Sequence, residues 1–112
     1  MKRAYLGEFE EIVLLMVAML ADDAYGVRIT HEIISQTRRQ VRLNQVHASL
    51  HRLEEKGMVN SRLGDPTAER GGRRKRIFKI TALGKRTLAD MSSVRDHLWS
   101  QIPSSLRIAK GS

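Results

Sequence analysis

LNQVHASLHRLEEKG, residues 43–57, is the stretch that decides how the rest of the chain is interpreted. Val46, Leu50 and Leu53 recur at positions i, i+4 and i+7, which is the spacing of one face of an α-helix. Gly57 follows at the point where a helix commonly ends in a left-handed residue. The stretch therefore predicts a helix with one buried face that ends near Gly57.

The opposite face of this helix carries short polar side chains. Amides pair with adenine edges, a small apolar side chain contacts a thymine methyl, and a cation binds guanine or phosphate. We therefore predict a recognition helix that reads the major groove of DNA, whereas a solvated face that touches nothing is the alternative. The predicted contact residues are Asn44, Gln45, His47, Ala48, His51 and Arg52.

Two strand-like segments follow, residues 58–63 and residues 73–80, and a Pro- and Gly-containing loop joins them. The second segment alternates basic and apolar residues, which is typical of a half-buried strand. Helix, strand, basic loop and strand is the order of a recognition helix followed by a wing, whose cations hold phosphates or enter the minor groove. We expect DNA contacts from the wing at Arg70, Gly71, Gly72, Arg73, Arg74, Lys75 and Arg76, and from the connection before the helix at Arg38, Arg39 and Arg42.

Two further helices are predicted before the recognition helix. The first extends from about Gly7 or Glu8 to Leu20 and is apolar almost all round, so it needs cover on more than one side. The second covers about residues 25–37, and the two aspartates at 22–23 suit its N-cap. Gly26 in its first turn indicates the close approach of another backbone.

The last predicted helix begins after Thr81, a good N-cap, and extends to about Ile102 before Pro103. Its apolar residues fall within one band and are expected to pack on the first helix of a second copy, which would give a two-fold dimer. Folding back on its own subunit is the alternative. The predicted dimer interface comprises Leu15, Met16, Met19, Leu88, Met91, Arg95, Leu98, Trp99 and Ile102.

Composition limits the function. The 112 residues suffice for one domain and an appended helix, and 20 Lys and Arg against 12 Asp and Glu give a formal charge of +8. Such a charge favours nucleic acid as the partner, with an anionic membrane surface as the rival. The longest apolar run, residues 12–21, is about half of what spans a bilayer and has acidic flanks, so we expect a cytoplasmic protein without a membrane partner.

Other chemistries find little support. His47 and His51 have a spacing that can hold a metal, but no carboxylate lies between them and the chain has no cysteine. Neither a Ser/His/Asp order nor a phosphate-binding glycine motif stands out, so we predict no enzyme, no metal and no cofactor. An RNA-binding or protein-interaction module is the alternative function, although five aromatic residues supply little base stacking.

Four segments resemble the PadR family of bacterial transcriptional regulators. They are YLGEFE (5–10), DDAYGV (22–27), LHRLEEKG (50–57) and GDPTAERGGRRKR (64–76), of which the last two together are specific. The resemblance covers about residues 6–88, and the single C-terminal helix is similar to the short-chain branch. It implies a mainly α fold with a small β-hairpin: a winged helix-turn-helix over 1–80, then a C-terminal dimerisation helix and short tail over 81–112.

The resemblance also implies a function. Members of the family usually repress genes, and some release DNA on binding a small molecule. We therefore expect a homodimeric repressor on a palindromic operator, with a small aromatic effector stacked on Trp99 as a further hypothesis. Where the family typically has a Tyr in a Val-Tyr-x-x-Leu pattern, this chain has His47, whose contact with DNA would then depend on its charge.

Overall fold

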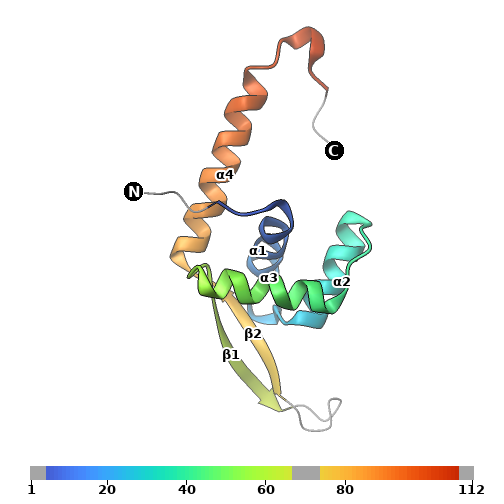
Figure 1. Cartoon of the computed structure of the whole chain (residues 1–112), viewed down its shortest axis with the longest axis vertical. Coiled ribbons are helices and arrows are strands. Elements are labelled where there is room, and N and C mark those ends of the chain that lie inside the picture. Colours follow the sequence, from blue (N-terminus) through green and yellow to red (C-terminus); the bar gives the residue numbers. More distant parts are fainter. Residues whose placement is uncertain (1–4, 67–73, 109–112) are drawn as a thin grey trace.

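Three helices, a β-hairpin and a fourth, projecting helix make up the computed structural model, which describes residues 5–66 and 74–108 (Figure 1). The predicted mainly helical fold with a small β-hairpin is confirmed. In chain order the elements are α1 (Glu8–Leu20), the 3₁₀ turn η1 (Ala21–Asp23), α2 (Gly26–Thr37), α3 (Leu43–Glu55), β1 (Val59–Pro66), β2 (Arg74–Ile80), α4 (Ala82–Ser100) and the 3₁₀ turn η3 (Ser104–Leu106).

The core lies between α1, α2 and α3, which contact one another pairwise. Each helix contributes its apolar face, and burying a Leu or Ile side chain completely is worth about 1.5–3 kcal/mol. The predicted buried face of α3 is confirmed, because its three apolar residues have at most 1% of their surface exposed. Fully buried core residues include Val13, Leu14, Val17, Ile29, Ile33, Val46, Leu50 and Leu53.

The start of α2 differs from the prediction. Its N-cap is Tyr25, which makes no side-chain capping bond, and Asp22 and Asp23 lie in η1 instead. The reason is that the chain pairs with the hairpin here: Tyr25 is extended and bridges Ile77, and the Phe78 N–H donates to the Ala24 carbonyl at 2.8 Å. This pairing displaces the aspartates from the helix start, so the predicted Asp cap is wrong.

The hairpin pairs β1 with β2 in antiparallel register, from Val59 opposite Ile80 to Arg62 opposite Ile77, with an irregularity between Leu63 and Pro66. Gly57, at a φ of +76°, is the left-handed residue expected after α3. The hairpin extends away from the helices as a wing (Figure 1). Of its predicted DNA contacts, Arg70, Gly71, Gly72 and Arg73 lie outside the described residues.

The first half of α4 is fastened to the body of the subunit. Thr81 is its N-cap, as predicted, and accepts a hydrogen bond from the Gly84 N–H at 3.1 Å. A Cβ on Gly84 would overlap the carbonyl oxygen of Met58, so only glycine permits this approach. Leu88 and Met91 pack against the core. This half of α4 therefore packs on its own subunit, which was the alternative considered for the last helix, whereas the second half projects outward (Figure 1).

Candidate nucleic-acid interface

The polar face of α3 is available to a partner. Asn44, Gln45, His47, Ala48 and His51 are exposed, whereas the residues on the opposite side are buried. Ser49 is also fully buried, although it lies outside the predicted apolar face of Val46, Leu50 and Leu53. The helix thus has the two-faced character predicted for it.

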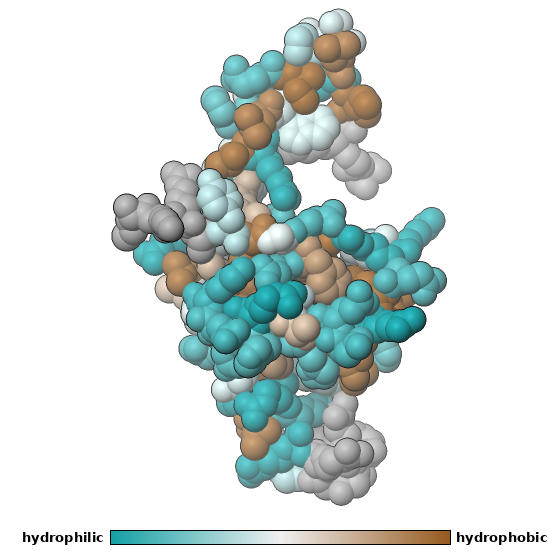
Figure 2. All heavy atoms as spheres, in the orientation of Figure 1, coloured by the Kyte–Doolittle hydropathy of each residue, from teal (hydrophilic) through white to brown (hydrophobic). Residues whose placement is uncertain are grey.

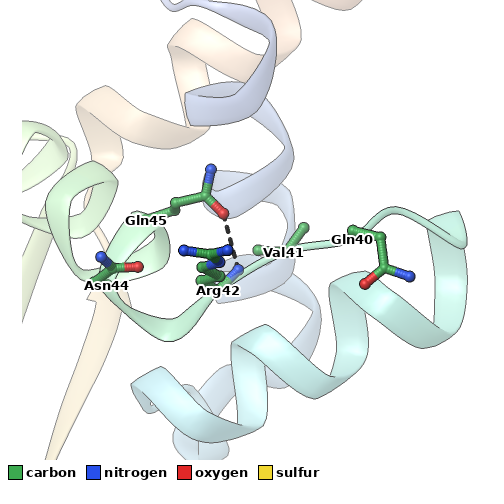
Figure 3. A pocket seen from close by; sticks show the side chains of 5 residues that line it. All are labelled: Gln40, Val41, Arg42, Asn44 and Gln45. Carbon is green, nitrogen blue, oxygen red and sulfur yellow. Dashed lines mark hydrogen bonds between the residues drawn. The ribbon is translucent and has the colours of Figure 1, made fainter.

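The N-terminal end of α3 is stabilised by one of the predicted base-contacting residues. The Gln45 side-chain oxygen accepts a hydrogen bond from the Arg42 backbone N–H at 2.9 Å, which caps the helix (Figure 3). Gln45 also lines an open hollow together with Gln40, Val41, Arg42 and Asn44. A Gln at the third helical position is a known capping signal. The sequence therefore held a sign of this structural role, which was missed.

His47 lies against the start of α2. A Cβ built on Gly26 would come within 2.6 Å of His47 Cε1 and 3.3 Å of Leu43 Cδ1. The close approach predicted at Gly26 thus exists, but side chains of α3 make it rather than a backbone. Because Gly26 has no side chain, the His47 imidazole can lie against the start of α2 while His47 stays on the exposed face of α3.

One edge of α3 is lined by cations that already have carboxylate partners on α1. Arg52 Nε lies 2.7 Å and Lys56 Nζ 2.8 Å from the two carboxylate oxygens of Glu10. Arg39, in the connection before α3, lies 2.9 Å from Glu8. Arg52 also donates to the buried Ser49 hydroxyl at 3.2 Å, while half of its side chain stays exposed. These two contacts hold the Arg52 guanidinium in a fixed position. Its remaining N–H groups could donate to a phosphate from there.

Glu10 holds its charge although it is buried. Burial alone raises the pKa of this carboxyl, but hydrogen bonds from Lys56 and Arg52, the charge of Lys56 and a backbone hydrogen bond with Gly7 together outweigh it. The net result is a pKa below the ordinary value of 4.5. Glu10 is thus a fixed anion beneath α3.

The other edge of α3 faces the wing, where Arg74 and Arg76 are exposed. Arg76 donates to the Ser61 hydroxyl at 3.1 Å across the hairpin, and Lys75 Nζ lies 4.1 Å from the centre of the Tyr25 ring. Arg38 and Arg42 are exposed as well. Arg38 ends α2 in the left-handed conformation, at a φ of 58°.

The residues predicted for a dimer interface fall into two groups. Leu15, Met19 and Leu98 leave 41%, 55% and 59% of their surface exposed, and Figure 2 shows hydrophobic side chains gathered at the far end of α4. Trp99 and Ile102 are half-buried. Met16, in contrast, is buried in the core of its own subunit, where Leu88 and Met91 also pack, and Arg95 pairs with Glu11 at 2.7 Å.

Other kinds of site find no support in the described part of the chain. Residues 5–66 and 74–108 contain no cluster of three metal-ligating side chains, so His47 and His51 have no third ligand there. Nor does any helix in these ranges have the length and hydrophobicity needed to cross a membrane.

A comparison with protein families identifies the family of the chain. The sequence model of the "Transcriptional regulator PadR-like family" matches residues 14–90. The chain belongs to this family. It is therefore a DNA-binding transcriptional regulator rather than an enzyme, as the sequence predicted. Among curated proteins, none matches the chain by sequence.

Solved structures share the winged-helix fold at low sequence identity. A PadR-like transcription factor from Bacteroides fragilis has a TM-score of 0.66 and 20% identity, covering 80% of this chain and 82% of that one. A PadR family regulator from Clostridium difficile has a TM-score of 0.63 and 20% identity, covering 80% and 91%. The complex structure of hsRosR-SG has a TM-score of 0.72 and 19% identity, covering 91% and 83%.

Proposed function

We propose that the protein is a homodimeric repressor that binds a palindromic operator, with α3 in the major groove and the wing along the adjacent backbone. The observation that carries the proposal is the exposed polar face of α3, with cations along both of its edges. A helix fits the major groove, and phosphate contacts on each side of it would fix its register.

The two sets of residues have different tasks in this proposal. Asn44, Gln45, His47, Ala48 and His51 face the bases, since they occupy the exposed side of α3. The cations hold phosphates and carry little sequence information. They comprise Arg38, Arg39, Arg42, Arg52, Arg70, Arg73, Arg74, Lys75 and Arg76, with Gly71 and Gly72 between Arg70 and Arg73 in the sequence.

Two-fold association is supported by the apolar surface left on α1 and α4. Leu15, Met19 and Leu98 are each at least 41% exposed. Apolar side chains gathered on a small protein commonly mark an interface. In a dimer formed there, two α3 helices would address half-sites about one duplex turn, or a multiple of it, apart.

Selection from random duplex DNA tests the operator and the dimer together. The winning duplex and a scrambled duplex are then titrated by fluorescence anisotropy at two salt concentrations, and the mass of the complex is measured. We expect an inverted repeat bound by two chains, about 10³-fold or more tighter than the scramble. Equal, steeply salt-dependent binding of both duplexes would mean that charge acts alone. Preference for RNA over duplex DNA would favour the RNA-binding alternative.

Repression and release need separate measurements. A promoter carrying the selected operator should lose reporter activity when the protein is present, whereas a rise would indicate an activator.

Release by a small aromatic ligand is proposed at Trp99, which lies half-buried on α4. Titrating flat aromatic compounds should change Trp99 fluorescence and weaken operator binding together. A fluorescence response without weaker DNA binding would contradict this effector role.

A further inference from the structure

Two consecutive carboxylates in the first turn of α1 connect two different helices. Glu10 and Glu11 are each only 7% exposed. Consecutive residues on a helix point about 100° apart, so they reach different neighbours. Glu10 contacts Arg52 and Lys56 on α3, whereas Glu11 lies 2.7 Å from Arg95 on α4. One turn of α1 therefore joins the helix that faces DNA to the helix that projects from the subunit.

The Arg95 ion pair is also one of three attachments that set the direction of α4, the middle one being the packing of Leu88 and Met91 on the core. The first is at its start, where Gly84 lies against the Met58 carbonyl and the Thr81 N–H donates to that carbonyl at 3.0 Å. Arg95 follows eleven residues after Gly84, about 16 Å along the helix axis. Because the pair with Glu11 is the attachment farthest from Gly84, it has the greatest leverage on the tilt of α4 relative to α1 and α3.

We propose that Glu10 and Glu11 are positioning residues that set the half-site spacing of the operator, because together they fix the angle between α3 and α4. This inference rests on the proposed dimer, in which α4 carries the interface and each α3 addresses one half-site. The angle between these two helices then determines the distance between the two recognition helices.

A small tilt of α4 has a large effect at its far end. Leu98 lies fourteen residues after Gly84, so a pivot of about 10° at Gly84 displaces it by about 3.6 Å. One base pair advances the duplex by about 3.4 Å. A tilt of this size on loss of the Glu11–Arg95 pair would change the preferred spacing by one base pair, or let several spacings bind equally.

The test measures affinity against spacing. Duplexes carry the selected half-sites at the selected spacing and at one to three base pairs more or fewer. The proteins are wild type, Glu11→Gln, Arg95→Gln and the double variant, each checked for folding by thermal unfolding. Arg86→Gln is the matched control, since Arg86 is an exposed cation of α4 for which the described residues show no ion pair.

Wild type and Arg86→Gln should prefer one spacing by about 10-fold or more over its neighbours. In Glu11→Gln this preference should fall to about 3-fold or less while the preferred bases within a half-site stay unchanged. The spacing preference of the double variant should equal that of each single variant, since all three lose the same Glu11–Arg95 interaction. If Glu11→Gln does not fold, Arg95→Gln supplies the same readout, because the Arg95 side chain is 55% exposed.

Two results would overturn the inference. One is a wild-type spacing profile in the Glu11→Gln or Arg95→Gln protein. The other is an equal loss of affinity at every spacing, which would mean that the pair only stabilises the fold. A wild-type protein without any preferred spacing would instead refute the proposed binding of two half-sites by a dimer.

Discussion

The cations on the two edges of α3 differ in what they already bind. On the α1 edge, Arg52 and Lys56 lie within 2.8 Å of Glu10, and Arg39 lies 2.9 Å from Glu8. On the wing edge, Arg74 and Arg76 are exposed, and the Arg76 guanidinium donates to a neutral hydroxyl rather than to a carboxylate. Among the described residues, Arg74 and Arg76 therefore present cations without a carboxylate partner to an approaching polyanion, whereas the α1 edge presents cations partly neutralised by fixed anions.

This difference predicts separate contributions to DNA binding, one to affinity and the other to the orientation of α3. A cation without a carboxylate partner gains the most from a phosphate and releases a counterion when it binds. A cation already held by a carboxylate gains less, but its side chain loses less conformational freedom on binding. We therefore expect the wing to supply most of the salt-dependent affinity, and the α1 edge to fix the orientation of α3.

The largest effect is expected from Arg74→Ala combined with Arg76→Ala. A dimer of this variant lacks four cations, so the slope of log affinity against log salt should become less steep by about 3 to 4. Affinity for the operator and for a scrambled duplex should fall together, since phosphate contacts are not sequence-specific. Anisotropy titrations over a range of salt measure both quantities. A loss confined to the operator would contradict the assignment of these residues to phosphates.

Glu10→Gln tests the other edge. The glutamine keeps the size of the side chain but removes the anion that holds Arg52 and Lys56. We expect the free energy of unfolding at neutral pH to fall by about 1–3 kcal/mol, the usual range for hydrogen bonds to a charged group. Two cations become free, so the salt slope of DNA binding should steepen. An unchanged slope would show that Glu10 does not compete with phosphate.

The stabilising effect of the Glu10 carboxylate can also be measured through the pH dependence of stability. The pKa of Glu10 in the folded protein is below the ordinary value of 4.5, so ionised Glu10 stabilises the fold above that value. Its contribution should be lost as the pH falls from about 4.5 through the lowered pKa. Urea unfolding followed at a series of pH values should show a shallower acid loss in Glu10→Gln than in wild type. Equal acid profiles would contradict this source of stability.

Arg38 is a cation near α3 whose backbone conformation lowers the stability of the fold. It adopts the left-handed conformation, which costs a residue with a Cβ about 1–2 kcal/mol. Arg38→Gly should therefore raise the free energy of unfolding by about 1 kcal/mol while weakening DNA binding by the loss of one cation per subunit. Arg38→Ala is the matched control, since it loses the same cation but keeps the strain. Equal stability of the two variants would refute the strain argument.

The sequence predicted the parts of the site that depend on local pattern. The buried and exposed faces of α3 follow from the spacing of Val46, Leu50 and Leu53, and the strand β2 follows from the alternation before Ile80. The ion pairs of Glu10 and Glu11 were missed, because Arg52 and Arg95 are distant in sequence and reach α1 only when the helices pack. First-turn carboxylates suit the helix dipole without any partner, so their pattern gave no reason to expect burial.

The smallest effect is expected from Gln45→Ala, at the end of α3 that neither edge holds by an ion pair. Gln45 caps α3 through the Arg42 N–H and lies on the exposed face, so its loss acts on both stability and base preference. Stability should fall by about 0.5–1 kcal/mol, as for the loss of a capping bond. In a selection from random duplexes the variant should favour other sequences while its salt slope stays as in wild type, because no cation is lost. Gln45→Glu is the control, because it keeps the oxygen that caps α3. If base preference changes in the alanine variant but not in the glutamate variant, the effect comes from the cap rather than from contact with a base.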